Sequence, residues 1–217
     1  MALFLLPATW NGYYSYFVPR AIPIRSDWIS DIGRIVTYAG LIATVLFIAW
    51  GSGDGLRRFG ISAVPWWKWM SVSLAALVFS LCSHREVSAM FYGPLPDSYN
   101  QSSELVRSNV AHVKAGWPNT AMHSMMFAVA AFAEELIMRG YLISRLSELF
   151  GRTWAAVLVS TAVFASYHIY EGTMAVVIIF LDGLAYSACL LVTKSLWPGA
   201  TAHALSNALQ LFVRVNY

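Results

Sequence analysis

Long stretches without a charged residue alternate with short polar segments along the chain. Four stretches contain no Asp, Glu, Lys or Arg: 35–53, 69–83, 115–133 and 195–213. Only two acidic residues interrupt the apolar sequence between Arg152 and Lys194. A helix needs roughly 20 mostly apolar residues to cross the hydrocarbon core of a bilayer. The pattern therefore predicts six membrane-spanning helices, at residues 33–51, 64–83, 118–141, 154–170, 173–193 and 196–214.

The segments between these spans differ in character. Residues 51–60 (GSGDGLRRFG) are typical of a turn, with two arginines placed to anchor it at the membrane interface. A long polar loop is expected from His84 to Pro118. The N-terminal residues are rich in Trp and Tyr and are expected to lie at the headgroup level. The predicted organisation is an interfacial segment, two spans with the long loop, and a core of four helices, at residues 1–32, 33–117 and 118–214.

The composition supports this interpretation. Of the 217 residues, 58% are hydrophobic and 12% are charged, whereas a soluble domain carries about 25% charged residues. So few charges cannot cover a water-facing surface, which excludes a soluble enzyme and a disordered chain. The net charge of +3 forms no basic stripe, so no nucleic-acid partner is expected. We therefore expect an all-α polytopic bundle in contact with a lipid bilayer. Its 14 Lys and Arg divide evenly between the two sides, which leaves the orientation open.

Ionisable residues inside the third span are the first functional signal. Glu134, Glu135 and Arg139 occur there in the sequence AEELIMRG, although a charge at mid-span costs about 2.5–3.5 kcal/mol. Glu135 and Arg139 are four residues apart with the acid first, the better arrangement for an ion pair on a helix. Glu134 points about 100° away from Glu135. One carboxylate is then neutralised locally and the other faces a different space. The alternative is a helix end that emerges into water.

Polar residues on two other spans could complete a site. His168 ends the fourth predicted span, and the sixth contains His203 and Asn207 on one helix face. A lone histidine in a membrane helix is more often a structural hydrogen-bonding group. Polar groups on three helices, however, are best accommodated by facing one another across a shared cavity.

Together these residue types could hydrolyse an amide bond. A carboxylate such as Glu134 can act as general base on water, and His168 can hold the same water and move its proton. N–H donors on His203 and Asn207 can stabilise an oxyanion. Because no Ser or Cys has an obvious nucleophile setting, water is the favoured attacking group.

Three segments carry a family resemblance. EELIMRG, FASYH and HALSN resemble the EExxxR, FxxxH and HxxxN motifs of the CPBP intramembrane proteases, which include CAAX prenyl endopeptidases and bacterial Abi or bacteriocin-processing proteins. The resemblance covers residues 118–214 and implies a glutamic-type endopeptidase. It implies that Glu134 and His168 activate water, that His203 and Asn207 form the oxyanion site, and that three residues support them: Glu135, Arg139 and Phe164.

Asp182 departs from the family pattern, and three histidines lie outside the motifs. The fifth helix of the family is usually glycine-rich and apolar, but here it carries Asp182, for which an interhelical hydrogen bond is favoured over catalysis. His123 is too far along its helix to act with Glu134. His84 and His112 are expected to be solvated in the long loop.

A zinc-dependent version of the same protease is an alternative. Glu134, His168 and His203 are a possible zinc-ligand set with water in the fourth position. The sequence lacks the HExxH spacing of zinc proteases on one helix, and the adjacent Asn207 suits an oxyanion better than a metal. Hydrolysis without a cofactor is therefore the favoured hypothesis.

Three functions fit the sequence to different degrees. The first is an endopeptidase acting on a membrane protein or peptide. The second is a catalytically silent scaffold or bacteriocin-immunity-type protein. The third, a proton-coupled transporter, predicts an inverted repeat, and the sequence shows no internal symmetry. The compact length favours a multi-pass protein of a prokaryotic plasma membrane.

Overall fold

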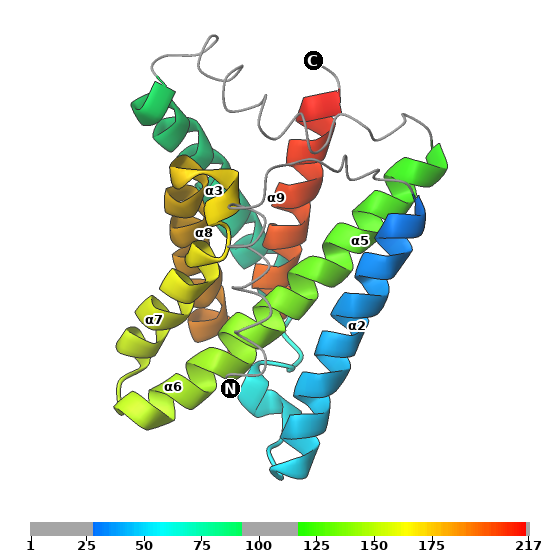
Figure 1. Ribbon diagram of the computed structural model, residues 1–217. Coiled ribbons are helices and arrows are strands. Elements are labelled where there is room, and N and C mark those ends of the chain that lie inside the picture. The colour runs from blue at the N-terminus through cyan, green and yellow to red at the C-terminus, as the bar shows by residue number, and fades with distance from the viewer. Residues whose placement is uncertain (1–27, 93–116, 216–217) are drawn as a thin grey trace.

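The computed structural model describes residues 28–92 and 117–215, and every regular element in them is helical (Figure 1). The N-terminal aromatic segment before residue 28 and most of the long loop, with His112, lie outside the described residues. The helices run in the order α2 (Trp28–Gly51), η1 (Leu56–Phe59), α3 (Trp66–Tyr92), α5 (Trp117–Glu135), η2 (Leu136–Leu142), α6 (Ile143–Phe150), α7 (Thr153–Ser166), η3 (Ile169–Glu171), α8 (Thr173–Thr193) and α9 (Trp197–Val215).

The predicted helical membrane bundle is confirmed. Within the described chain, three helical stretches are long and apolar enough to cross a bilayer: Asp31–Gly51, Trp66–Phe91 and Thr173–Thr193. Helix α7 is also apolar but shorter, and α5 and α9 carry the polar residues of the motifs. Large apolar side chains on the outer surface are exposed, among them Val36, Phe47 and Leu74. In an integral membrane protein these side chains face lipid instead of water.

The predicted ends of the second and fourth spans are wrong. Helix α3 continues to Tyr92, so His84 lies on a helix and not in a solvated loop. Its polar residues His84, Arg85 and Glu86 suggested a helix end, but backbone hydrogen bonding does not require an apolar sequence. The fourth predicted span breaks after Ser166, and His168 occupies the turn between α7 and η3.

The third span is longer than predicted and contains a π-helix. Helix α5 passes through η2 into α6 without interruption, so the helical segment ends at Phe150. In η2 the Met138 carbonyl accepts from the N–H of Ile143, five residues later. It also accepts from the Ser160 hydroxyl of α7 at 2.6 Å. Such π segments often mark functional sites, and this one contains Arg139.

The long α5–η2–α6 helix organises the bundle (Figure 1). Helix α5 packs between α2 and α9, η2 and α6 pack on α7, and α8 packs on α3, α7 and α9. Close approach of η1 depends on Gly140, where a Cβ would lie 2.6 Å from the Phe59 carbonyl oxygen. The acidic residues at the end of α5 therefore lie between α2 and α9, and Arg139 of η2 faces α7 and α8.

A network of ion pairs and hydrogen bonds holds the turn between α2 and α3 against α6. Asp54 accepts from the Ser52 hydroxyl at 2.6 Å and pairs with Arg58 and Arg145. Arg58 also pairs with Glu148 of α6. The Ser52 hydroxyl, followed by the Arg145 guanidinium, lowers the pKa of Asp54 to about 2.

We expect Asp54→Asn to lower the melting temperature of the detergent-solubilised protein at pH 7 by a few degrees. Because the folded-state pKa of Asp54 is depressed, its stabilisation is complete above the usual Asp pKa of roughly 3.9. It is lost as the pH falls toward about 2. The difference between wild type and variant should therefore shrink over that range. Glu86→Gln, at a side chain that is 74% exposed, is the control. An equal fall in melting temperature in that variant would contradict a specific role for the Asp54 ion pairs.

Candidate active site

A buried ion pair forms the base of the site. The Glu135 carboxylate lies 3.2 Å from Nη1 of Arg139, and the side chains are 1% and 0% exposed. The same Glu135 oxygen accepts from Nδ1 of His203 on α9 at 3.0 Å. A carboxylate only accepts, so Nδ1 carries the proton. The predicted Glu135–Arg139 pair is thus present, and it also fixes the orientation of His203.

Glu134 approaches the opposite side of the same imidazole ring. Its Oε2 lies 3.7 Å from Nε2 of His203, and its Oε1 accepts from the Tyr38 hydroxyl of α2 at 3.4 Å. The Glu134 side chain is 17% exposed, compared with 1% for Glu135. The two adjacent carboxylates therefore have different surroundings: one is enclosed by cations and the other is accessible.

Aromatic rings enclose the charged groups. The Arg139 guanidinium lies over the Phe164 ring, 4.2 Å from its centroid, and 5.8 Å from that of Tyr186. Tyr186 stacks on His203 with centroids 5.1 Å apart. Gly183 leaves room for this arrangement, because a Cβ there would lie 2.9 Å from Nη2 of Arg139. Cation–π contacts of this kind stabilise a desolvated guanidinium.

His168 adjoins the cluster at Phe164, and its Nε2 lies 4.0 Å from the carboxylate of Glu171, outside the cluster. Its Nδ1 lies 2.9 Å from the Phe164 carbonyl oxygen, which fixes the ring. The Phe164 ring contacts both histidines, with centroids 5.0 Å from His168 and 6.0 Å from His203. Asn207 is half-buried one turn beyond His203 on α9, and none of the described hydrogen bonds of the charged cluster involves it.

The sequence did not identify Tyr38 or Tyr186 as parts of this cluster. Tyr38 lies in the most uniformly apolar predicted span, and Tyr186 lies one helical turn after Asp182 in the fifth predicted span. Both tyrosines resemble ordinary apolar helix residues in the sequence, so only the packing of α2 and α8 against the motifs identifies them.

Two further polar pairs connect helices outside the cluster. His84 Nε2 lies 3.0 Å from Oδ2 of Asp182, which confirms the interhelical hydrogen bond favoured for Asp182. His123 of α5 bonds Asp31 of α2 through Nδ1 at 2.8 Å, and both are buried. His123 thus pairs with α2 and not with the Glu134 region.

The described residues do not assemble a zinc site. Across 28–92 and 117–215, no group of three or more His, Cys, Asp and Glu side chains is arranged to hold a metal ion. Nδ1 of His203 is directed at Glu135 and Nδ1 of His168 at a backbone carbonyl. These contacts leave Nε2 as the ring nitrogen of each histidine that is directed elsewhere, so the zinc-dependent alternative stays a prediction.

Residues 116–209 match the family of type II CAAX prenyl endopeptidases described as Rce1-like. The match covers the C-terminal part of the chain and is a similarity to that family. The resemblance to CAAX-type proteases drawn from the three motifs is thereby confirmed. No curated protein and no solved structure matches the chain. The Rce1-like region runs from the start of α5 into α9 and contains all the motif residues, whereas α2 and α3, with Tyr38 and His84, lie outside it.

Proposed function

We propose that this protein is an intramembrane endopeptidase that hydrolyses a peptide bond of a membrane-associated protein or peptide. The observation that carries the proposal is the position of His203 between two carboxylates. Glu135 holds one ring nitrogen at 3.0 Å, and Glu134 lies 3.7 Å from the other. The similarity of the Rce1-like region to a protease family supports the reaction class.

Glu134 is the proposed general base. It removes a proton from water while the water oxygen attacks the substrate carbonyl carbon, and His168 orients that water. The carbonyl oxygen becomes an oxyanion, which accepts hydrogen bonds from His203 and Asn207. Collapse of the intermediate breaks the C–N bond, and the proton held by Glu134 passes to the leaving amine.

The Glu135–Arg139 pair is proposed to position His203. With Nδ1 donating to Glu135, Nε2 is the ring nitrogen that faces the accessible carboxylate. When Nε2 carries a proton, it can donate a hydrogen bond to an oxyanion. This assignment makes the protein a glutamic-type protease in which zinc carries no step.

The substrate class follows from where the cluster lies. A site enclosed by apolar helices receives chains that already lie in or on the bilayer. The family name points to C-terminal peptides that carry a prenyl group. The proposed enzyme is of a bacterial type, located in the plasma membrane and related to the Abi group.

The proposal is tested by comparing cells that express the wild type or Glu134→Gln. Enrichment of protein termini from the membrane fraction should reveal new termini that depend on Glu134. A farnesylated CAAX peptide and its unprenylated counterpart, added to purified protein in liposomes, test the prenyl preference. If wild type and variant produce the same termini, the catalytically silent scaffold becomes the better description.

Activity is expected to survive metal removal. Protein treated with EDTA and shown by elemental analysis to be metal-free should retain its full rate, because Glu134 and His203 act without zinc. Thermolysin, a zinc protease, assayed under the same conditions is the control for chelation. Loss of activity that returns with stoichiometric Zn²⁺ would contradict the proposed mechanism.

A further inference from the structure

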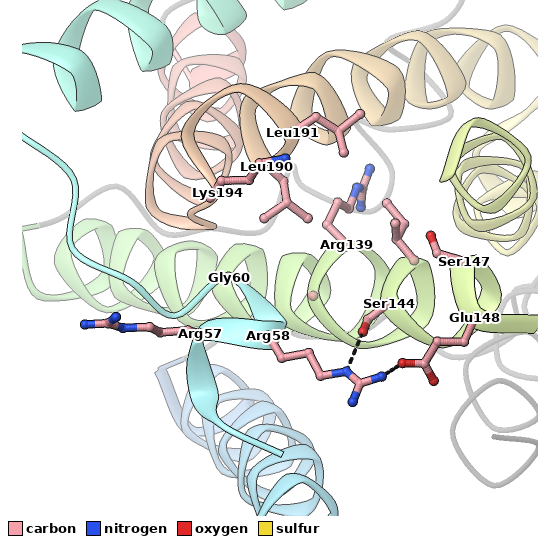
Figure 2. A pocket seen from close by; sticks show the side chains of 12 residues that line it. Arg57, Arg58, Gly60, Arg139, Ser144, Ser147, Glu148, Leu190, Leu191 and Lys194 are labelled. Carbon is pink, nitrogen blue, oxygen red and sulfur yellow. Dashed lines mark hydrogen bonds and ion pairs between the residues drawn. The ribbon is translucent and has the colours of Figure 1, made fainter. Parts of the chain in front are cut away.

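A hollow of about 380 Å³ lies at the end of the bundle formed by η1, α6 and the last turn of α8 (Figure 2). It is distinct from the Glu134 side of the catalytic cluster. The basic side chains on its wall come from three separate segments, and serines and leucines complete it. The lining includes Arg57, Arg58, Ser144, Ser147, Leu191 and Lys194.

Several polar groups that line this hollow have no partner among the described side chains, which indicates a ligand. The Ser147 hydroxyl is buried and has no hydrogen-bond partner among the described residues. Lys194 and Arg57 form no ion pair with any described side chain. Arg58 donates Nε to Ser144 at 3.3 Å and pairs with Glu148, so its guanidinium is fixed at the rim. Arg139, paired with Glu135, closes the inner end of the hollow.

The charge at this end of the bundle favours an anion. Segments 51–68, 144–153 and 191–197 carry six basic but only two acidic side chains. Both acids, Asp54 and Glu148, are already paired with arginines. A phosphate group accepts hydrogen bonds from arginine, lysine and serine together.

The same end lies at the expected depth of lipid headgroups. Tryptophans concentrate at the membrane interface, and this end carries five partly or fully exposed ones: Trp50, Trp66, Trp67, Trp154 and Trp197. Leu191 on the wall is 38% exposed and faces outward from the end of α8. A headgroup in the hollow can therefore leave its acyl chains against an apolar helix surface.

We propose that this hollow binds the phosphate of an anionic ligand, with an anionic phospholipid headgroup as its source. Lys194 supplies attracting charge on the wall, and the Ser147 hydroxyl donates to a phosphate oxygen. Arg57 adds positive charge at the rim, where its side chain extends away from the hollow (Figure 2). Basic pockets between membrane helices bind anionic headgroups in this way. The residues proposed to bind the phosphate, Arg57, Lys194 and Ser147, have no role in the proposed peptide hydrolysis, although Arg139 lines the inner end of the hollow and also pairs with Glu135.

The test measures lipid-dependent stabilisation of the purified full-length chain in a neutral detergent. Added dioleoyl phosphatidylglycerol should raise the melting temperature, and dioleoyl phosphatidylcholine should not. The Arg57→Gln/Lys194→Gln variant should need at least about tenfold more phosphatidylglycerol for half of the effect. Ser147→Ala, which changes no charge, should need a few-fold more.

Lys68→Gln/Arg152→Gln is the matched control. It removes two charges from the same end of the bundle at residues outside the hollow, and it should respond to phosphatidylglycerol as the wild type does. Inorganic phosphate tests the second source of the same chemistry. Protection by millimolar phosphate, lost in Arg57→Gln/Lys194→Gln, would support the phosphate site but assign it to a soluble ligand. An unchanged lipid response in that variant, or an equal loss in the control, would overturn the proposal.

Discussion

Glu134→Gln is expected to abolish peptide hydrolysis, with kcat reduced by about 10²–10⁴-fold. The amide keeps the size of the carboxylate and can still accept from Tyr38, but it cannot take a proton from water. Because Glu134 is 17% exposed and belongs to no buried ion pair with arginine, the variant should fold normally. The measurement is the single-turnover cleavage rate in liposomes, together with the melting temperature of the same preparation.

Two control variants make this result specific. Glu86→Gln changes the same residue type at a side chain that is 74% exposed on α3, and it should cleave at the wild-type rate. Tyr38→Phe removes the hydroxyl that donates to Glu134 at 3.4 Å, and it should reduce the rate only modestly. Undiminished cleavage by folded Glu134→Gln would remove Glu134 from the mechanism and leave the rest of the site to be reassigned.

Arg139→Met is expected to be the most destabilising substitution in the bundle. It leaves the Glu135 carboxylate, which is 1% exposed, with only His203 as a charged partner. Breaking one side of a buried ion pair costs about 3–5 kcal/mol. It also removes the cation that lies 4.2 Å from the Phe164 ring centroid. The free energy of unfolding in mixed micelles, followed by tryptophan fluorescence, measures the loss.

A double variant separates the unpaired charge from lost packing. In Glu135→Gln/Arg139→Met no uncompensated charge remains, and the glutamine carbonyl can still accept from Nδ1 of His203. We expect the double variant to regain most of the lost stability, as buried ion pairs replaced by apolar residues often do. If the double variant is as unstable as Arg139→Met alone, the guanidinium stabilises the bundle through its ring contacts and not through Glu135.

Much of this protein follows from local sequence patterns. The predicted fifth span matches α8 at both ends, Thr173–Thr193. An apolar run with Asp182 as its one charged residue, bounded by Gly172 and Lys194, determines where the helix can lie in lipid. The pairing of Glu135 with Arg139 also follows from spacing, since four residues place both side chains on one face of a helix.

Other features depend on contacts that no local pattern records. The π segment arises where η2 packs against α7, whose Ser160 hydroxyl bonds the Met138 carbonyl. The continuation of α3 to Tyr92 places His84 beside Asp182 of α8. In both cases a group forms a hydrogen bond with a side chain from a distant helix, which the local sequence does not identify.

The sequence by itself determined that the chain is a helical membrane protein and which helices carry its ionisable residues. Charge-free runs and short motifs are visible in neighbouring residues alone. Because placing a charge in lipid is costly, a long charge-free run indicates a membrane helix, and a charge inside one indicates a functional residue. Only the tertiary structure decided that His203 lies between Glu134 and Glu135, that Tyr38 and Tyr186 adjoin them, and that basic residues from three segments line one hollow. These arrangements depend on the rotation and depth of each helix relative to its neighbours, which side-chain packing sets across the whole bundle.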